Sequence, residues 1–284
     1  MDIRKTAVIG AGTMGNGIAQ VFAHKGTPVI LVDVEQAFLD RGMKAIRKNL
    51  GRLVKKEKLA SDEMEEIVGR IKPTLRMEDA GEADLVVEAA TENVTVKKKI
   101  FTDLDAVLPE ASLLTSNTSS ISITELGAVT KRPDRVAGMH FMNPVPVMAL
   151  VEVVRGLETS EETMNAVIQA SKDLDKAPVV VDDSPGFVSN RVLLPMINEA
   201  AFTLMEGVAT KEAIDDVMRL GMRHPMGPLA LADLIGLDVC LSILNVLHDG
   251  FGDPKYRPCP ILKRMVAAGH LGKKTGRGFY TYDS

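Results

Sequence analysis

Cysteine is scarce in this sequence. Cys240 and Cys259 are the only two in 284 residues, and they show neither Cys-x-x-Cys spacing nor the spacing of a metal site. This argues against a disulfide scaffold and suits a reducing compartment. Apolar runs of membrane-spanning length are also missing, and the first apolar run begins too close to the N-terminus for a signal peptide. We therefore expect a cytoplasmic protein that binds no metal.

A strong net charge of either sign is missing as well. The chain has 34 basic and 38 acidic residues, which gives a formal net charge of −4. Overall electrostatics provide no attraction to nucleic acid or to anionic membranes, so a local cluster of cations has to bind any anionic ligand. Internal repeats and low-complexity tracts do not occur. With 45% hydrophobic residues, the chain is long enough for two domains and a sizeable core.

The most informative feature that is present is the glycine-rich loop at residues 10–15, directly after the apolar run 7–9. In a dinucleotide-binding βαβ unit, Gly10 permits the tight turn out of the strand, Gly12 lets the backbone approach a pyrophosphate, and Gly15 lets the helix pack closely. The N-terminus of that helix offers unpaired N–H groups to the phosphates. The loop therefore predicts a nucleotide site.

Asp33 indicates which nucleotide binds. It ends the next apolar run, 29–32, about twenty residues after the glycines, where a carboxylate accepts hydrogen bonds from both ribose hydroxyls. The next residues, Val34 and Glu35, include no arginine for a 2′-phosphate, so NAD is favoured over NADP. The alternative for Asp33 is an ordinary turn acid.

Short apolar runs alternate with helical stretches through the first two thirds of the chain, which predicts a parallel, doubly wound sheet. The expected strands are 7–9, 29–32, 85–88, 113–114, 136–138, 150–154 and 177–181. A charged helical insertion at about 36–70 divides into two helices near residues 59–61. The pattern then breaks at Asp183-Ser184-Pro185-Gly186. Helices are expected at 192–206, 211–220, 229–247 and 261–268.

The predicted fold is therefore α/β, with a Rossmann-like nucleotide-binding domain over residues 1–184 and an all-helical domain over residues 185–284. Polar residues 116–120 follow one strand at the edge of the sheet where ligands bind. Ser122 and Glu125 fit a capping box for the next helix. Such capping leaves Asn117 and Ser119 for a ligand.

His140 follows the predicted strand 136–138, and a histidine there can take a proton near neutral pH. Glu152 interrupts the apolar run 150–154, so its carboxylate either faces solvent or is buried with a partner. If Glu152 is buried, pairing with His140 would compensate its desolvation and fix the tautomer of the imidazole.

Asn190 opens the first helix after the domain boundary, where it either caps that helix or reaches a ligand in a cleft. A basic run crowds the helical insertion, either as a solvated face or as a site for a multiply phosphorylated ligand. The run comprises Lys44, Arg47, Lys48, Arg52, Lys55, Lys56 and Lys58.

Taken in order, these motifs resemble the L-3-hydroxyacyl-CoA dehydrogenase family, in particular its short monofunctional 3-hydroxybutyryl-CoA dehydrogenase type. The similarity spans nearly the whole chain, including residues 224–228 and 272–276. The motifs are Gly10-Ala11-Gly12-Thr13-Met14-Gly15 with Gly17-Ile18-Ala19, Ser116-Asn117-Thr118-Ser119-Ser120, His140-Phe141-Met142-Asn143-Pro144, Glu152, and Asp183-Ser184-Pro185-Gly186-Phe187 with Asn190-Arg191.

The resemblance implies that His140 is the general base, that Glu152 orients it, and that Ser119 and Asn190 position the oxygen atoms of the substrate. The hydroxyl proton would pass to the imidazole as hydride leaves C3 for the nicotinamide, on the (S) isomer of a 3-hydroxyacyl-CoA. Butyrate-type fermentation, fatty-acid degradation and carbon-fixation cycles could all use this reaction, and the sequence does not choose among them.

By the same resemblance, Arg52 and Lys56 meet the phosphates of coenzyme A, and the helical domain binds substrate and forms a homodimer. Many relatives have asparagine where this chain has Arg223, so that position is left out of the predicted site. The predicted NAD contacts are Gly10, Gly12, Thr13, Met14, Gly15, Asp33, Glu92, Lys97, Asn117, Asn143 and Lys274.

Two rival functions are compatible with the glycine loop. One is another NAD(P)-linked hydroxyacid dehydrogenase, of the class that uses a lysine base in its helical domain. The other is a nucleotide-binding protein that has lost turnover. The presence of Ser119, His140, Glu152 and Asn190 together favours the 3-hydroxyacyl-CoA dehydrogenase.

Overall fold

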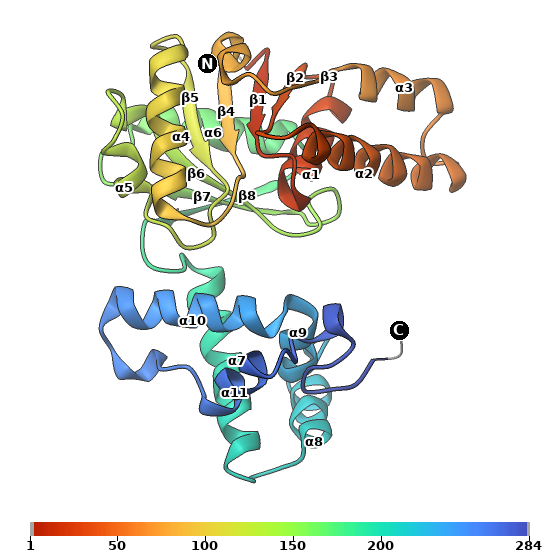
Figure 1. Cartoon of the computed structure of the whole chain (residues 1–284), viewed down its shortest axis with the longest axis vertical. Helices are drawn as coiled ribbons and strands as arrows, with labels where there is room; N and C mark the ends of the chain where they lie inside the picture. The colour runs from red at the N-terminus through yellow and green to blue at the C-terminus, as the bar shows by residue number, and fades with distance from the viewer. Residues whose placement is uncertain (1–2, 283–284) are drawn as a thin grey trace. The chain divides into compact units, whose positions relative to one another are not determined.

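A computed structural model describes residues 3–282 (Figure 1). Contacts divide the chain into two units, one ending at Asp183 and the other beginning at Ser184. The first unit is a sheet with helices, and the second is helical. The family-level prediction of an α/β sheet domain followed by a helical domain is confirmed.

The first unit contains one eight-stranded sheet in the order β3-β2-β1-β4-β5-β6-β7-β8. The strands are β1 (Thr6–Ile9), β2 (Val29–Val32), β3 (Ile71–Thr74), β4 (Leu85–Glu88), β5 (Leu113–Ser116), β6 (Val136–Phe141), β7 (Leu150–Arg155) and β8 (Ala177–Asp182). Strands β1, β2 and β4 are buried at every position, as expected of parallel strands covered on both faces.

The sequence predicts a parallel sheet, which is wrong for its last two strands. β7 pairs antiparallel with β6, and β8 runs parallel to β7. The eight-residue connection 142–149 between β6 and β7 is too short for the crossover that a parallel pair requires. Strand β3 is absent from the sequence prediction because its sequence, Ile-Lys-Pro-Thr, lacks an apolar run; proline is tolerated there because β3 is an edge strand.

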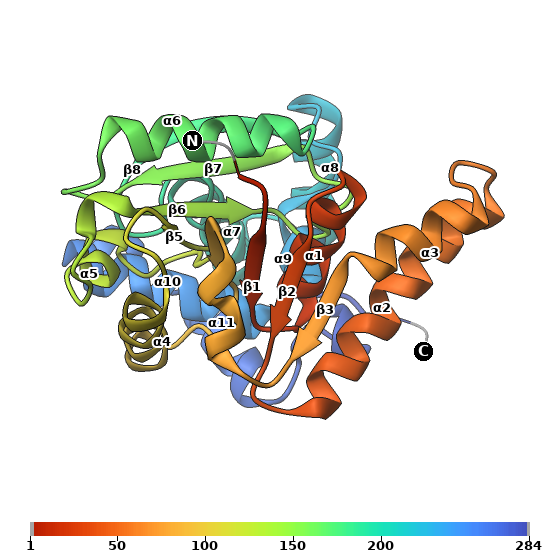
Figure 2. The same cartoon turned by 90° about the horizontal axis from the view of Figure 1, so that it is seen from above.

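Helices cover the sheet of the first unit. They are α1 (Thr13–His24), α2 (Gln36–Lys55), α3 (Ser61–Gly69), α4 (Val94–Val107), α5 (Ile123–Gly127) and α6 (Glu161–Asp173). Figure 2 shows α6 running along β7 and β8, while α2 and α3 extend outward near the β3 edge. Helices α1, α2, α3 and α6 share one apolar core with the sheet. The predicted break between α2 and α3 is present, and Ser122 caps α5 by accepting a hydrogen bond from the Glu125 N–H.

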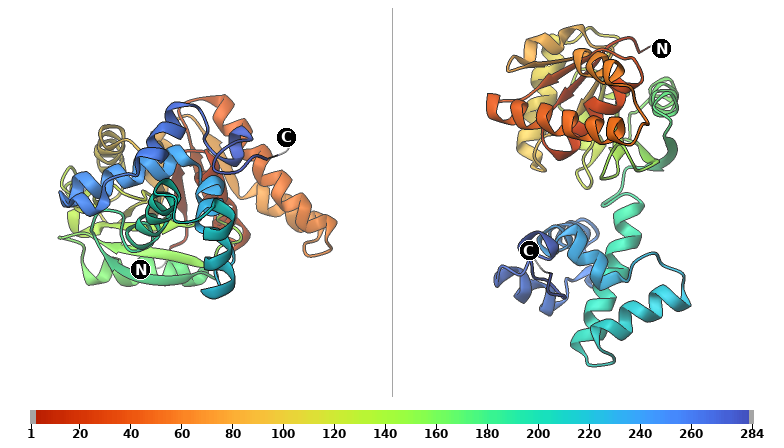
Figure 3. Two further views of the ribbon diagram at one scale, coloured as in Figure 1. Left: turned by 90° about the horizontal axis from the view of Figure 1, so that it is seen from below. Right: turned by 90° about the vertical axis from the view of Figure 1, so that its right-hand side faces the viewer.

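The second unit packs its helices around α7, which contacts α8, α9, α10 and α11 (Figure 3). The helices are α7 (Ser189–Met205), α8 (Lys211–Asp216), α9 (Pro228–Ile235), α10 (Leu237–Phe251) and α11 (Pro260–Ala267). The single helix predicted over 229–247 is wrong, because Gly236 adopts φ +106° and separates α9 from α10. Among residues 3–282, no single helix is long and apolar enough to span a membrane; α9 and α10 qualify only as a pair, which is bent by 99°.

Two buried aspartates fasten the C-terminal segment of the second unit. Asp233 accepts hydrogen bonds from the N–H groups of Phe279 and Tyr280 and from the Tyr282 hydroxyl. Asp215 accepts one from the Tyr280 hydroxyl, at 2.9 Å. Burial and the Asp233 carboxylate together raise the pKa of Tyr282 to about 12, which keeps this hydroxyl a hydrogen-bond donor through the neutral range.

Candidate active site

The glycine-rich loop joins β1 to α1 as the sequence predicts. Gly10 adopts φ +102°, which favours glycine, and a Cβ at Gly15 would lie 1.7 Å from the Gly10 carbonyl oxygen. A Cβ at Gly12 would meet no protein atom within 4 Å. Gly12 is also the N-cap of α1 and makes no side-chain cap, so the first N–H groups of the helix face an open approach. This cradle fits a pyrophosphate.

Asp33 lies beside this loop, immediately after β2. Its Oδ2 accepts a hydrogen bond of 2.6 Å from the Ala11 N–H, and its Oδ1 accepts one of 2.7 Å from the Val34 N–H. These contacts fix the carboxylate next to the glycine loop, while part of the residue stays exposed. The position fits a ribose bound beside the pyrophosphate.

His140 and Glu152 face one another across two neighbouring strands. They are register partners in the antiparallel pair β6–β7, and His140 Nδ1 lies 2.8 Å from Glu152 Oε2. Both residues are buried, with 7% and 2% of their surface exposed. The sequence predicts His140 just after its strand, but the structure places it inside β6, because that strand continues to Phe141. When Nδ1–H donates to the carboxylate, Nε2 is the atom that can exchange a proton.

The polar loop after β5 lies against the same strand. The side-chain oxygen of Asn117 accepts a hydrogen bond of 2.8 Å from the backbone N–H of Phe141, the residue after His140. Ser119 donates its backbone N–H to Glu92 Oε1 at 2.9 Å. The structure therefore brings together three stretches that are far apart in the sequence, around residues 92, 117–119 and 140.

A buried cluster beneath this loop contains a residue that sequence reasoning missed. Lys97, which is 1% exposed, donates to both carboxylate oxygens of Glu88 at 2.7 and 2.8 Å. Glu88 is fully buried at the end of β4, where the sequence pattern indicates only the last residue of an apolar strand. An acid that ends a buried strand, followed by a lysine on the next helix, was the available signal.

Three further predicted residues of the first unit, Asn143, Arg52 and Lys56, lie outside the Glu88–Lys97 cluster. Asn143 is exposed on the loop that follows β6. Arg52 is exposed near the end of α2, and Lys56 caps its C-terminus. Among the described residues, the side chains able to hold a metal ion form no group of three or more histidines, cysteines or carboxylates.

Asn190 and Lys274 belong to the second unit. Asn190 is the second residue of α7, and Val188 occupies the N-cap position, so the capping alternative for Asn190 is wrong. Lys274 Nζ lies 2.7 Å from an oxygen of Asp238, the second residue of α10. Arg223 adopts φ +57° in the segment before α9.

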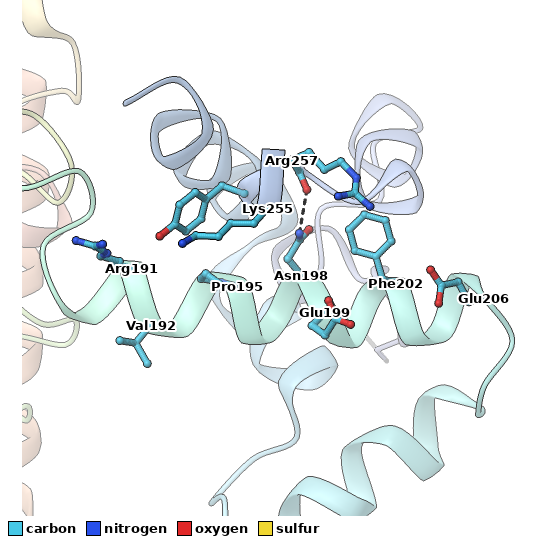
Figure 4. Close-up of a pocket in the computed structure, with 10 residues that line it drawn as sticks. Arg191, Val192, Pro195, Asn198, Glu199, Phe202, Glu206, Lys255 and Arg257 are labelled. Carbon is cyan, nitrogen blue, oxygen red and sulfur yellow. Dashed lines mark hydrogen bonds between the residues drawn. The ribbon is translucent and has the colours of Figure 1, made fainter. Parts of the chain in front are cut away.

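One face of α7 borders a hollow of about 570 Å³ (Figure 4). Cations lie over aromatic rings around it, with Arg191 over Phe251 and Arg257 over Phe202. Figure 4 shows Arg191 and Glu206 toward opposite ends of the lined face. The lining residues are Arg191, Val192, Pro195, Asn198, Glu199, Phe202, Glu206, Lys255, Tyr256 and Arg257.

Comparison with known proteins agrees with this geometry. The model of the 3-hydroxyacyl-CoA dehydrogenase NAD-binding domain matches residues 5–184, and that of the C-terminal domain of the same family matches residues 186–282. The chain is 56% identical to a probable 3-hydroxybutyryl-CoA dehydrogenase of Bacillus subtilis, over 100% of this chain and 99% of the relative. It is 51% identical to the 3-hydroxybutyryl-CoA dehydrogenase of Clostridioides difficile, over 98% and 99%.

A solved structure gives the same result. The crystal structure of (S)-3-hydroxybutyryl-CoA dehydrogenase from Ralstonia eutropha matches with a TM-score of 0.97 and 53% identity, over 100% of both chains. The two family models together span nearly the whole sequence and meet at the boundary between the two units. The chain therefore belongs to the 3-hydroxyacyl-CoA dehydrogenase family.

Proposed function

We propose that this protein catalyses the NAD-dependent, reversible oxidation of (S)-3-hydroxyacyl-CoA to 3-ketoacyl-CoA, with 3-hydroxybutyryl-CoA and acetoacetyl-CoA as the substrate pair. The relatives at 51–56% identity carry the name 3-hydroxybutyryl-CoA dehydrogenase. The observation that carries the proposal is the buried His140–Glu152 pair on neighbouring strands of an NAD-binding domain. A carboxylate that binds one ring nitrogen fixes the tautomer and orients the imidazole, as proton transfer requires.

In this mechanism His140 Nε2 accepts the proton of the 3-hydroxyl group. Glu152 holds the ring by its Nδ1 atom and stabilises the imidazolium that forms. Ser119 and Asn190 position the substrate oxygen atoms. NAD, when bound, supplies the hydride acceptor. In the reverse direction the imidazolium donates its proton to the ketone oxygen, so one residue serves as base and as acid.

The NAD site proposed for the first unit combines the glycine loop with the sheet edge. Gly10, Gly12, Thr13, Met14 and Gly15 hold the pyrophosphate. The carboxylate of Asp33, which the Ala11 N–H holds in place, accepts hydrogen bonds from the ribose hydroxyls and repels a 2′-phosphate, so the cofactor is NAD rather than NADP. The other residues proposed to line the cofactor site are Glu92, Lys97, Asn117, Asn143 and Lys274.

The phosphates of coenzyme A bind the cationic row on α2. Arg52 and Lys56, the C-cap of α2, are the proposed contacts, and Lys48 and Lys44 precede them at steps of four residues along a row that winds slowly round the helix. Within residues 3–282 none of these four cations forms an ion pair, whereas the neighbouring Arg47 pairs with Glu65 at 2.8 Å. A row of cations without acidic partners favours a polyanionic ligand.

The same proposal includes two properties of the whole protein. The second unit binds substrate through Asn190 and forms a homodimer. The protein acts in the cytoplasm, where its two buried cysteines stay reduced.

Initial rates of acetoacetyl-CoA reduction, measured with NADH and NADPH separately, test the function. We expect rapid turnover with NADH, slow turnover with NADPH, and a loss of at least about a hundredfold in kcat for His140→Ala. Full activity of His140→Ala would favour a dehydrogenase with a different base. Binding of NADH without reduction of any 3-ketoacyl thioester would favour a protein that has lost turnover.

A further inference from the structure

The buried cluster formed by Glu88, Lys97 and Ser116 lies between β4, α4 and β5. Both oxygens of Glu88 accept hydrogen bonds from the Lys97 ammonium, and Oε2 also accepts one of 2.6 Å from the Ser116 hydroxyl. The backbone N–H of Ala90 donates to Oε1 at 2.7 Å. The carboxylate is thus saturated with donors in a site that water does not reach. Such a buried ion pair is costly to break, because either partner alone would leave an uncompensated charge.

Glu92 connects this cluster to the loop that carries Ser119. Its Oε2 lies 3.5 Å from Lys97 Nζ, and its Oε1 accepts a hydrogen bond of 2.6 Å from the Thr118 hydroxyl. The N–H and the hydroxyl of Ser119 donate to the same oxygen at 2.9 and 3.3 Å, and the Ser120 hydroxyl donates to it at 3.1 Å. Three consecutive residues of the loop therefore converge on one carboxylate oxygen.

The charge on Glu92 is secured by the same contacts. Burial by itself raises the pKa of Glu92, but Lys97 and the hydrogen bonds from Thr118, Ser119 and Ser120 outweigh it and leave the pKa below its ordinary value. The carboxylate is consequently ionised across the neutral range, and an ionised acceptor makes the stronger hydrogen bonds to the loop.

The loop is also fastened from its other end. The Ser116 hydroxyl, which donates to Glu88, accepts a hydrogen bond of 3.0 Å from the backbone N–H of Thr118. Glu88 and Glu92 are thus both attached to the loop, and Lys97 contacts both of them. The Lys97 side chain has 1% of its surface exposed, so its charge reaches the site chiefly through these two acids.

We propose that Lys97 and Glu92 are positioning residues, which hold Ser119 where the substrate oxygen binds. The inference rests on the proposed function, because it gives Ser119 a substrate to position. Both residues are predicted to line the cofactor site, and the inference gives them a second role, in positioning the substrate.

A double-mutant cycle of Glu92→Gln with Ser119→Ala tests the proposal. Glutamine keeps an acceptor oxygen but loses the charge that faces Lys97. With acetoacetyl-CoA and saturating NADH, we expect Glu92→Gln to lower kcat/KM by about tenfold to a hundredfold. In the Ser119→Ala background the same change should lower it less than about twofold further, because the residue through which it acts is gone. Equal losses in the two backgrounds would overturn the proposal.

Lys98→Met provides a matched control. Lys98 is the next residue on α4 and forms an exposed ion pair with Glu125, so its removal should change kcat/KM by less than about twofold. The pair of changes Lys97→Met and Glu88→Gln removes the buried charges together. This double variant should lower kcat/KM by about the same factor as Glu92→Gln. When Glu92→Gln is added to the double variant, kcat/KM should fall by less than about twofold further.

Hydrogen exchange separates this proposal from the proposed function. Glu92→Gln should speed the exchange of the backbone amides of residues 118–121 at least about tenfold, while the amides of α6 stay unchanged. Unaltered exchange in this loop would refute the positioning role. If the unmodified protein fails to reduce acetoacetyl-CoA with NADH, the proposed function fails, and the exchange rates still decide the role of Lys97 and Glu92.

Discussion

Single residues with strong chemical requirements define the site of this protein. Glu152 is 2% exposed on a strand whose neighbouring residues are apolar, and a lone carboxylate there would be strongly destabilising. His140 compensates it by a 2.8 Å contact. The pair is therefore both a structural requirement of the sheet and, in the proposed mechanism, the group that moves the proton.

Replacing Glu152 by glutamine separates these two contributions. The amide oxygen can still accept the Nδ1–H hydrogen bond, so the protein should fold, but the charge that stabilises the imidazolium is lost. We expect kcat to fall by about tenfold to a hundredfold, as measured by NADH oxidation with saturating acetoacetyl-CoA.

Glu161→Gln is the control for this change, because Glu161 is an exposed acid paired with Arg155 at the end of β7. It should leave kcat within about twofold of the unmodified protein. An unchanged kcat in Glu152→Gln would show that the carboxylate has no part in proton transfer.

Motifs with a fixed local geometry could be predicted from the sequence. The glycine loop, the position of Asp33 and the cap of α5 each depend on a few adjacent residues. The contact between Glu88 and Lys97 could not be predicted, because it depends on how α4 packs against β4 and β5. Sequence patterns indicate which side chains are polar, but they do not predict which polar side chains come into contact when helices pack on strands.

At the scale of whole elements, the prediction failed where tertiary structure overrides the local pattern. The direction of β7 follows from the connection before it, which the apolar pattern of the strand does not record. Residues 229–247 form an apolar stretch with helical periodicity, but Gly236 adopts a positive φ and the Leu237 N–H donates to the Leu271 carbonyl, so α9 ends there. A single glycine in an apolar helix pattern does not by itself specify a break.

The packing of α1 on β1 depends on a position without a side chain. In Gly15→Ala the new methyl group would lie 1.7 Å from the Gly10 carbonyl oxygen, so α1 has to move away from the loop. We expect a loss of about 3 kcal/mol in the free energy of unfolding, together with weaker NADH binding. Urea denaturation and NADH fluorescence titration measure the two effects.

Gly51→Ala is the matched control on α2, because a Cβ there meets no atom within 4 Å and the residue lies inside a helix. It should raise the free energy of unfolding by about 0.5–1 kcal/mol and leave NADH binding unchanged. Normal stability and normal NADH affinity in Gly15→Ala would contradict the close packing of α1 against the loop.

At the scale of the whole molecule, the proposed homodimer needs a surface that matches a second copy of itself. The face of α7 that borders the hollow has Arg191 near its start, Glu199 past its middle and Glu206 at its C-cap, and Arg257 lies over Phe202 between these two acids. Two copies of this helix placed antiparallel across a two-fold axis would set Arg191 of each against Glu206 of the other. We therefore propose that this face of α7 forms the contact.

A charge swap tests this contact. Glu206→Arg should raise the dimer dissociation constant by at least about tenfold, because it sets like charges against each other. Adding Arg191→Glu should restore part of the loss. Analytical ultracentrifugation over a range of protein concentrations measures both. Glu212→Arg, an exposed acid on α8, is the control and should leave the dissociation constant unchanged; an unaffected dimer in Glu206→Arg would exclude this face.

The antiparallel pairing of β6 and β7 gives the proton-transfer pair a robustness of its own. His140 and Glu152 are register partners in this ladder, so the backbone pairing of β6 with β7 holds their side chains at 2.8 Å. Substitutions within residues 142–149 that keep the length and the turn of this connection should leave the His140–Glu152 pairing in place. The composition of this connection can therefore vary around the site while the sheet keeps the reacting pair together.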